Sequence, residues 1–254
     1  MKIAEKLLLS LSREYVQSSS SVEEFKPEVS LRLLRRVYPD FLSMIAQKSV
    51  LDFGCGTGRQ SVAFRMNGAR YVVGLDTNER HLHKARELAK KYCPENNVEF
   101  VNSIENRLLG KFDIVISQNS MEHFDDPTAR VKDMKSMLSK DGVILITFGD
   151  PWFAPYGSHM QFFTKIPWVN ILFSEKTVMN VRAHFRGDGA KRYEEVESGL
   201  NRMSVAKFER IIAHCGMRIR FKRYECVKGF NFLAAIPIVR ELFINRISCI
   251  LGQS

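Results

Sequence analysis

A glycine-rich turn between an apolar run and a helical pattern constrains this chain more than any other feature. The run 49–53 is typical of a buried strand, and glycines follow at positions 54, 56 and 58 before a helical pattern over 60–66. Because glycine lacks a Cβ, such a turn lets backbone N–H groups approach a ligand at the N-terminus of the helix. The dinucleotide spacing G-x-G-x-x-G does not fit, since Arg59 stands where its third glycine would fall.

The region around this turn alternates short β-rich runs with helical patterns. Helices are predicted to open near Thr77 and to cover 127–138. Four further strands are predicted at 71–76, 98–101, 112–117 and 143–148. The run 112–117 is apolar almost throughout, as expected of a strand buried on both faces. This alternation is typical of an α/β fold with a doubly wound, mostly parallel sheet.

The chain is expected to divide into four parts around this sheet. Helical patterns on both sides of the four serines 18–21 predict an N-terminal helical flap over 1–46, followed by the ligand-binding core over 47–149. Residues 150–203 hold aromatics, prolines and glycines in a stretch too long for a simple connection, which predicts a lid inserted after the fifth strand.

Residues 204–254 are expected to return to the core. A helix is predicted near 204–215, an antiparallel strand pair at 217–224 and 229–235, and a terminal helix over 236–251. The strand pair brings the predicted sheet to seven strands. The apolar segment 236–251 is interrupted by charges and is too short for a membrane span, but it could lie on a membrane surface.

Charge and cysteine usage narrow the possible partners. The formal net charge is +10, and residues 151–254 carry 16 Lys and Arg against 8 Asp and Glu. Such an excess can attract nucleic acid, an anionic lipid surface or a phosphate-bearing substrate, and solvated side chains without a partner are the alternative. The five cysteines have no disulfide or metal-binding spacing, which predicts a cytoplasmic setting and no metal site.

The motif Val50-Leu51-Asp52-Phe53-Gly54-Cys55-Gly56-Thr57-Gly58 resembles the first motif of class I S-adenosylmethionine-dependent methyltransferases, in particular the type 11, ubiquinone-pathway-like subgroup. The resemblance extends over about residues 48–149 and implies a Rossmann-like methyltransferase fold with S-adenosylmethionine as the cofactor. In that family the acidic residue of the first strand helps to hold the methionine amino group, a role that matches Asp52. The loop backbone at Gly54, Cys55, Gly56 and Gly58 would then pack on the methionine part.

The resemblance assigns the rest of the cofactor site to three further loops. Asp76 matches the carboxylate that accepts hydrogen bonds from both ribose hydroxyls, with Thr77 beside it, and a helix cap is the alternative role for Asp76. After the third strand the family usually places an Asp near the adenine amino group, where this chain has Asn102, Ser103 and Ile104. The loop after the fourth strand adds Ser117, Gln118 and His123.

The segment Met121-Glu122-His123-Phe124-Asp125-Asp126-Pro127 is similar to a loop of ubiquinone-pathway O-methyltransferases, some of which use acidic residues here with a metal ion. Asn119 stands where they carry an extra Glu, so no metal is predicted. His123 is a candidate general base, because an unperturbed histidine titrates near neutral pH, and a contact with the methionine part or the lid is its alternative role. His159 and Tyr156 are further candidate proton acceptors, although core packing is the alternative explanation for the lid aromatics.

These features favour an O-methyltransferase that acts on a small-molecule, glycan or lipid-linked acceptor, in the cytoplasm or peripherally at the inner face of the membrane. Two alternatives stay open: an RNA methyltransferase, for which the positive charge of 151–254 argues, and a non-catalytic regulator that binds S-adenosylmethionine. Neither an Asn-Pro-Pro-aromatic run nor a Pro-Cys nucleophile is present, which argues against base methylation by the routes that use them. The sequence indicates no oligomeric state.

Overall fold

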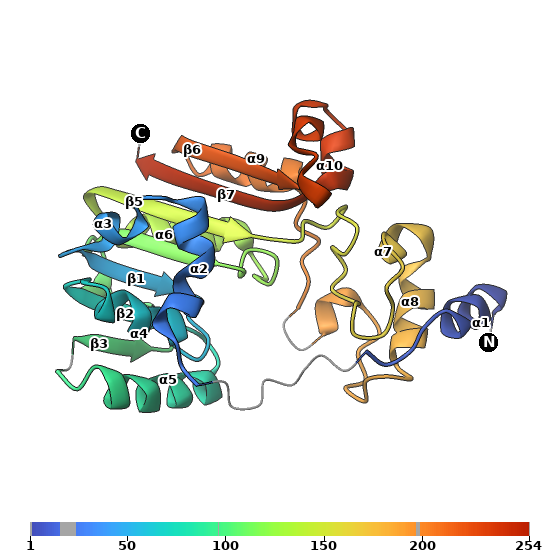
Figure 1. Ribbon diagram of the computed structural model, residues 1–254, viewed down its shortest axis with the longest axis horizontal. Helices are drawn as coiled ribbons and strands as arrows, with labels where there is room; N and C mark the ends of the chain where they lie inside the picture. Colours follow the sequence, from blue (N-terminus) through green and yellow to red (C-terminus); the bar gives the residue numbers. More distant parts are fainter. Residues whose placement is uncertain (1, 16–23, 96, 197–198, 254) are drawn as a thin grey trace.

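A seven-stranded sheet forms the centre of the computed structural model, which describes residues 2–15, 24–95, 97–196 and 199–253 (Figure 1). Its strand order is β3-β2-β1-β4-β5-β7-β6. The strands are β1 (Ser49–Phe53), β2 (Tyr71–Leu75), β3 (Val98–Val101), β4 (Phe112–Gln118), β5 (Leu138–Phe148), β6 (Met217–Cys226) and β7 (Ile244–Gln253). All neighbouring pairs are parallel except those of β7, which is antiparallel to both β5 and β6. The predicted doubly wound fold of seven strands is confirmed.

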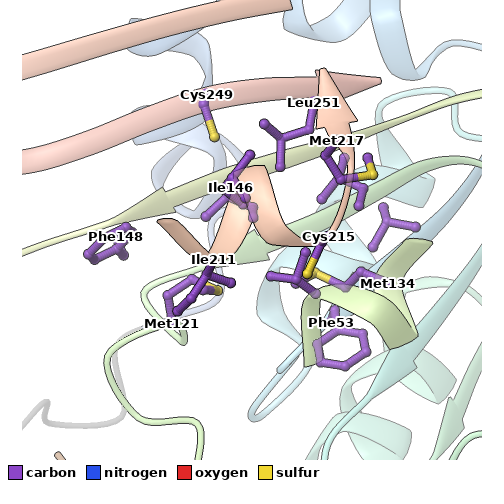
Figure 2. Packing of buried hydrophobic residues seen from close by; sticks show 14 of the residues in the cluster. Phe53, Met121, Met134, Ile146, Phe148, Ile211, Cys215, Met217, Cys249 and Leu251 are labelled. Atoms are coloured by element: carbon purple, nitrogen blue, oxygen red, sulfur yellow. The ribbon is translucent and has the colours of Figure 1, made fainter. Parts of the chain in front are cut away.

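Helices cover both faces of the sheet and bury its alternating side chains. On one face lie α2 (Pro27–Val37), α3 (Phe41–Ile45), α4 (Arg59–Met66) and α5 (Glu79–Tyr92). On the other lie α6 (Pro127–Met137) and α9 (Val205–His214), with the 3₁₀ turn η1 (Asn106–Leu108). Figure 2 shows this second layer, where Ile211 and Cys215 of α9 and Met134 of α6 pack over the sheet.

Local caps explain where these helices begin. The Asn78 side chain accepts hydrogen bonds from the backbone N–H groups of Arg80 and His81 at the start of α5. Asp126 accepts from Ala129 before α6, and Ser204 accepts from Lys207 before α9. These oxygens satisfy backbone donors that have no partner inside the helix.

The segment after β5 folds around a core of its own. It contains α7 (Val169–Leu172), α8 (Glu175–Arg182) and the 3₁₀ turn η2 (Tyr193–Glu195). Its buried cluster includes Phe163 and Val178 and takes in Leu8 from α1 (Ile3–Ser10). The side chain of Asn180 donates to Glu5, with 2.7 Å between Nδ2 and Oε1. The segment therefore forms a body beside the sheet, at the right of Figure 1.

The helices of the predicted N-terminal flap thus divide between two bodies. α1 packs on α8 of the inserted segment, whereas α2 packs on α4 beside the sheet. The serines 18–21 lie outside the described residues. The boundaries 1–46, 47–149, 150–203 and 204–254 stay predictions.

The two elements predicted for the end of the chain are wrong. Residues 229–235 do not pair with β6; they hold the 3₁₀ turns η3 (Val227–Gly229) and η4 (Asn231–Ala235). The terminal helix is limited to α10 (Val239–Phe243), and the residues after it form β7, inserted between β5 and β6. Ile244, Ile247 and Leu251 fit helical spacing, but they are buried because β7 is covered on both faces, and periodicity cannot separate such a strand from a helix. Among the described residues, no helix is long and apolar enough to cross a bilayer.

Candidate functional site

The carboxyl ends of β1 and β4 lie side by side where the strand order reverses. From β1 the chain proceeds outward through β2 to β3, and it then returns to place β4 on the opposite side of β1. In open α/β sheets a ligand binds in the crevice above such a switch point. The glycine turn follows β1 and the segment 119–123 follows β4, so both predicted loops meet where this crevice is expected.

The glycine turn adopts a conformation that favours glycine. Gly54, Gly56 and Gly58 have φ of 84°, 52° and 72°, in the left-handed region. A Cβ on Gly54 would lie 2.5 Å from Oγ of Ser120, so the β4 loop closes on the turn from one side. Apart from Gly56 and its two chain neighbours, no atom of the described residues lies within 4 Å of a Cβ placed on Gly56, so the turn is open there.

Asp76 forms hydrogen bonds both to the glycine turn and to the start of the helix that follows it. One carboxylate oxygen accepts from the N–H of Gly56 at 2.8 Å, and the other accepts from the N–H of Asn78 at 2.9 Å. Thr77 beside it is exposed. The carboxylate therefore fixes the glycine turn and faces the crevice with acceptor capacity left for hydroxyl groups.

Asp52 lies beneath the turn and is 2 % exposed. Its Oδ2 accepts a hydrogen bond of 2.6 Å from Oγ of Ser61 on α4. Burial raises the pKa of Asp52 to about 7, although the Ser61 hydrogen bond partly opposes the shift. Cys55 is also buried and packs against the backbone of Gly74. A Cβ built on Gly74 would lie 2.9 Å from Sγ of Cys55.

The residues after β3 are more open. Asn102 and Ser103 are exposed, and Oγ of Ser103 donates to Oδ1 of Asn102 at 3.2 Å. Ile104 is half-buried against the sheet core. β3 is the strand next to β2, so these three side chains lie on the far side of Asp76 from β4.

Polar atoms without partners gather at the end of β4. Within the described residues, Oγ of Ser117, Oε1 of Gln118 and Oε2 of Glu122 are buried and have no hydrogen-bond partner. Buried polar atoms are nearly always hydrogen-bonded in folded proteins, so unpaired ones beside a crevice indicate a place for a polar ligand.

His123 is held by the inserted segment. Its Nδ1 lies 2.8 Å from the backbone oxygen of Gly199, which can only accept, so Nδ1 carries the proton and Nε2 of the neutral ring is free to accept one. The rings of His123 and His159 are 5.5 Å apart, edge to face. Burial and the neighbouring His123 lower the pKa of His159 to about 4. Tyr156 is half-buried, and its backbone oxygen accepts from the N–H of His159.

The structure adds charged residues that the sequence did not mark as site residues. Glu122 is 3 % exposed, and burial raises its pKa to about 7 while Arg246 and Asp150 act on it in opposite directions. Burial also raises the pKa of Asp150, which follows β5. Nη1 of Arg246 lies 3.5 Å from Oδ1 of Asn119. Glu122 and Asp150 could have been inferred from their places after two predicted strands, but Arg246 could not, because its strand was predicted as a helix.

Asn201 joins the inserted segment to the β4 loop. Its side-chain Nδ2 donates to the backbone oxygens of Met121 and Phe124, each at 2.7 Å, and its N–H donates to the backbone oxygen of Glu122 at 3.0 Å.

The described residues contain no group of three or more His, Cys, Asp or Glu that could hold a metal ion.

Known proteins share both the sequence pattern and the fold. Residues 46–183 match a family described as a methyltransferase domain. The ubiquinone biosynthesis O-methyltransferase of Neisseria meningitidis serogroup C is 31% identical over 131 residues, which cover 49% of this chain and 53% of that protein. The chain thus spans about half the length of the curated relatives it matches.

Two solved structures illustrate the shared fold. An S-adenosylmethionine-dependent methyltransferase from Mesorhizobium loti has a TM-score of 0.57 at 17% identity, covering 90% of this chain and 98% of its own. The magnesium protoporphyrin IX methyltransferase of Synechocystis PCC 6803, crystallised with bound SAH, has a TM-score of 0.54 at 16% identity, covering 98% and 93%.

Proposed function

Because this chain belongs to the class I S-adenosylmethionine-dependent methyltransferases, we propose that it methylates a hydroxyl oxygen of a small-molecule, glycan or lipid-linked acceptor. The similarity to ubiquinone biosynthesis O-methyltransferases supports oxygen as the methylated atom. The observation that carries the proposal is the hydrogen bond between His123 and Gly199, which leaves a neutral imidazole nitrogen free beside the crevice.

The residues at the crevice fit the cofactor. Asp76 would hold the ribose hydroxyls, Asp52 and the glycine turn would hold the methionine part, and the unpaired oxygens of Ser117 and Gln118 would accept from its polar groups. When bound, S-adenosylmethionine supplies an electrophilic methyl group on a sulfonium.

The cofactor site extends to the exposed residues after β3. Asn102, Ser103 and Ile104 would face the adenine, the first two through hydrogen bonds and the third through packing. Cys55 and Thr77 contribute mainly through their backbone, because Cys55 is buried under the turn and Thr77 opens toward α5.

We infer that His123 is the general base. With S-adenosylmethionine bound as the methyl donor, Nε2 of His123 would take up the proton that the acceptor hydroxyl loses on methylation. His159, whose pKa is lowered to about 4, would stay neutral beside the His123 ring and add no positive charge there. Tyr156 would line the acceptor side of the same turn.

The inserted segment would enclose the acceptor. Positioning two reactants and excluding water can supply much of the acceleration of such a transfer. The basic excess of residues 151–254 favours an anionic acceptor, such as one that carries a phosphate. We infer a cytoplasmic enzyme, since all five cysteines are free thiols. Peripheral contact at the membrane would require an exposed apolar surface.

Calorimetric titration with S-adenosylmethionine tests the cofactor site, with NAD as the control ligand. We expect micromolar binding of S-adenosylmethionine alone, worth about 8 kcal/mol. Asp76→Ala should weaken it at least tenfold, because a charged partner of the ribose and the anchor of Gly56 are both removed. Binding of NAD instead, or unchanged affinity in the variant, would contradict the assignment.

A further inference from the structure

An apolar segment projects from the sheet between β6 and β7. Residues 227–243 run through η3, η4 and α10, at the top of Figure 1. Five large apolar side chains here are at least one-third exposed: Phe230 (49%), Phe232 (67%), Ile236 (43%), Ile238 (84%) and Leu242 (36%). Single exposed apolar residues are ordinary, but a contiguous group of them marks a surface that another body covers.

Two of the three charged side chains of this segment, those of Arg240 and Glu241, bind α9, whereas Lys228 is exposed. The Glu241 carboxylate accepts from the N–H groups of Val205 and Ala206, at 3.0 and 2.7 Å, and so caps α9. Nη2 of Arg240 donates to Oε2 of Glu209 on the same helix at 2.6 Å. A surface loop in water would hide its apolar side chains, whereas this segment exposes five of them and binds two of its three charged side chains to α9.

The backbone holds Ile238 outward at a conformational cost. Its φ of 71° and ψ of −57°, with a hydrogen bond of 2.8 Å from the N–H of Val239 to the oxygen of Pro237, describe a classic γ-turn. This turn is rare, and a β-branched residue at positive φ is an outlier. Strained residues that persist in folded proteins cluster at sites of function.

A positively charged depression lies at the base of the segment. Arg36, Arg223 and Arg246 all approach the carboxylate of Glu225, at 2.7, 3.4 and 3.9 Å. Arg36 and Arg223 line a depression there together with Glu225 and Asn231. Three guanidinium groups around one carboxylate leave a net positive charge, and residues 217–243 carry six Lys or Arg against two Glu.

The segment also adjoins the candidate site. Its last residue, Phe243, packs edge to face on Trp168 of the inserted segment, with ring centroids 6.0 Å apart. Two residues later, the backbone oxygen of Asn245 lies against Gly149. A Cβ built on Gly149 would be 2.2 Å from that oxygen. The end of the segment therefore lies beside Gly149, the residue before Asp150.

We propose that residues 227–243 dock this protein on an anionic lipid surface. The exposed aromatic and aliphatic side chains enter the boundary between headgroups and acyl chains, and the arginines around Glu225 attract the lipid phosphates. Docking places the crevice at the lipid surface, where a lipid-linked acceptor can enter it. That last step rests on the proposed function, whereas the lipid contact itself does not.

Vesicle flotation tests the contact with the full chain and without cofactor or acceptor. Vesicles of phosphatidylcholine alone are compared with vesicles that also contain phosphatidylglycerol. We expect the protein to float with the anionic vesicles, less so as salt is added, and hardly at all with the neutral ones. The double variant Phe232→Ser/Ile238→Gly should lose about tenfold or more in vesicle affinity, because both side chains are removed from the contact.

The variants are chosen so that misfolding cannot imitate the result. Glycine is at ease at the positive φ of residue 238, so that substitution relieves strain. Leu109→Ser is the matched control, since Leu109 is 42% exposed in the turn before β4, the central strand, and is not part of residues 227–243. It should bind vesicles like the parent chain.

Three results would overturn the proposal. The parent chain fails to bind anionic vesicles, or the double variant binds as well as the parent, or the parent is a dimer in solution that the double variant converts to a monomer. In the last case a second copy of this chain covers the segment. Loss of vesicle binding with unchanged S-adenosylmethionine affinity separates this proposal from the proposed function.

Discussion

The imidazole of His123 has one nitrogen fixed and one free, and this arrangement predicts how its loss affects the reaction. His123→Ala should reduce kcat roughly 100-fold or more, because a positioned general base contributes at least that much. Its affinity for S-adenosylmethionine should stay near that of the parent. Steady-state kinetics with calorimetric titration separate the two effects. His83→Ala is the control, because His83 is exposed on α5, and equal turnover in both variants would leave His123 a structural role.

The carboxyl group of Glu122 predicts a pH dependence of stability. Burial raises its pKa from the ordinary value of 4.5 to about 7, so the folded state holds the proton more tightly than the unfolded state does. Stability therefore falls as pH rises from about 4.5 to about 7 and levels off above that.

Glu122→Gln removes this titration. The variant should be more stable than the parent at pH 8, on the order of 3 kcal/mol, and nearly equal to it at pH 5. Thermal unfolding of both proteins at the two pH values measures the difference. Glu87→Gln, at an exposed position of α5, should keep the pH dependence of the parent, because Glu122 is still present. A gain of the same size at both pH values would mean that the charge of Glu122 is not the cause.

At the scale of elements, Asn201 connects the inserted segment to the β4 loop through hydrogen bonds of its side chain. Asn201→Ala removes two side-chain hydrogen bonds to the oxygens of Met121 and Phe124 and should cost about 1–3 kcal/mol of stability. The backbone at 119–125 should exchange hydrogen faster, and kcat should fall more than cofactor affinity. Asn180→Ala removes a similar bond, to Glu5, away from this loop. It should change neither hydrogen exchange at 119–125 nor kcat.

The elements also show what the sequence could reveal. Local signals were sufficient for β1 to β5 and for the capped helices, because Gly58, Asn78 and Asp126 mark turns and helix starts through their own backbone preferences. The partner of β6 was not local. β6 pairs with a strand 18 residues further on, across two 3₁₀ turns and a short helix, and only tertiary packing selects that pairing over a helix.

In the candidate site too, residues with a local sequence signal could be predicted, and residues brought in by tertiary packing could not. The glycine turn and Asp76 could be placed by motif, and the structure brings them together through the hydrogen bond from Gly56. Arg246 and Asn201 reach the β4 loop from more than 75 residues away in the sequence, and nothing in their local sequence indicates that position.

At the scale of the whole molecule, the inserted segment and α1 share a core separate from the two layers around the sheet. Leu8→Ala should cost about 2–4 kcal/mol, since Leu8 is fully buried in that core. Hydrogen exchange should accelerate in 160–193 and remain slow in β1 to β4, with S-adenosylmethionine binding retained. Leu7→Ala is the matched control on the same helix, because Leu7 is 52% exposed. Uniform destabilisation of both bodies would show that they unfold as one.

The place of β7 between β5 and β6 imposes an order on how the molecule is put together. β6 is synthesised first, yet among the described residues it pairs with β7 alone, so its native partner is missing until the later strand is in place. The same strand supplies the backbone oxygen of Cys249, to which the hydroxyl of Tyr38 donates at 3.0 Å. Tyr38 follows α2 directly, so the end of α2 lacks this hydrogen bond until β7 is in place. A nascent chain that ends before β7 would leave the edge of β5 open to pairing with other chains. The sheet is therefore completed only once β7 has been synthesised, and until then the edge of β5 stays exposed.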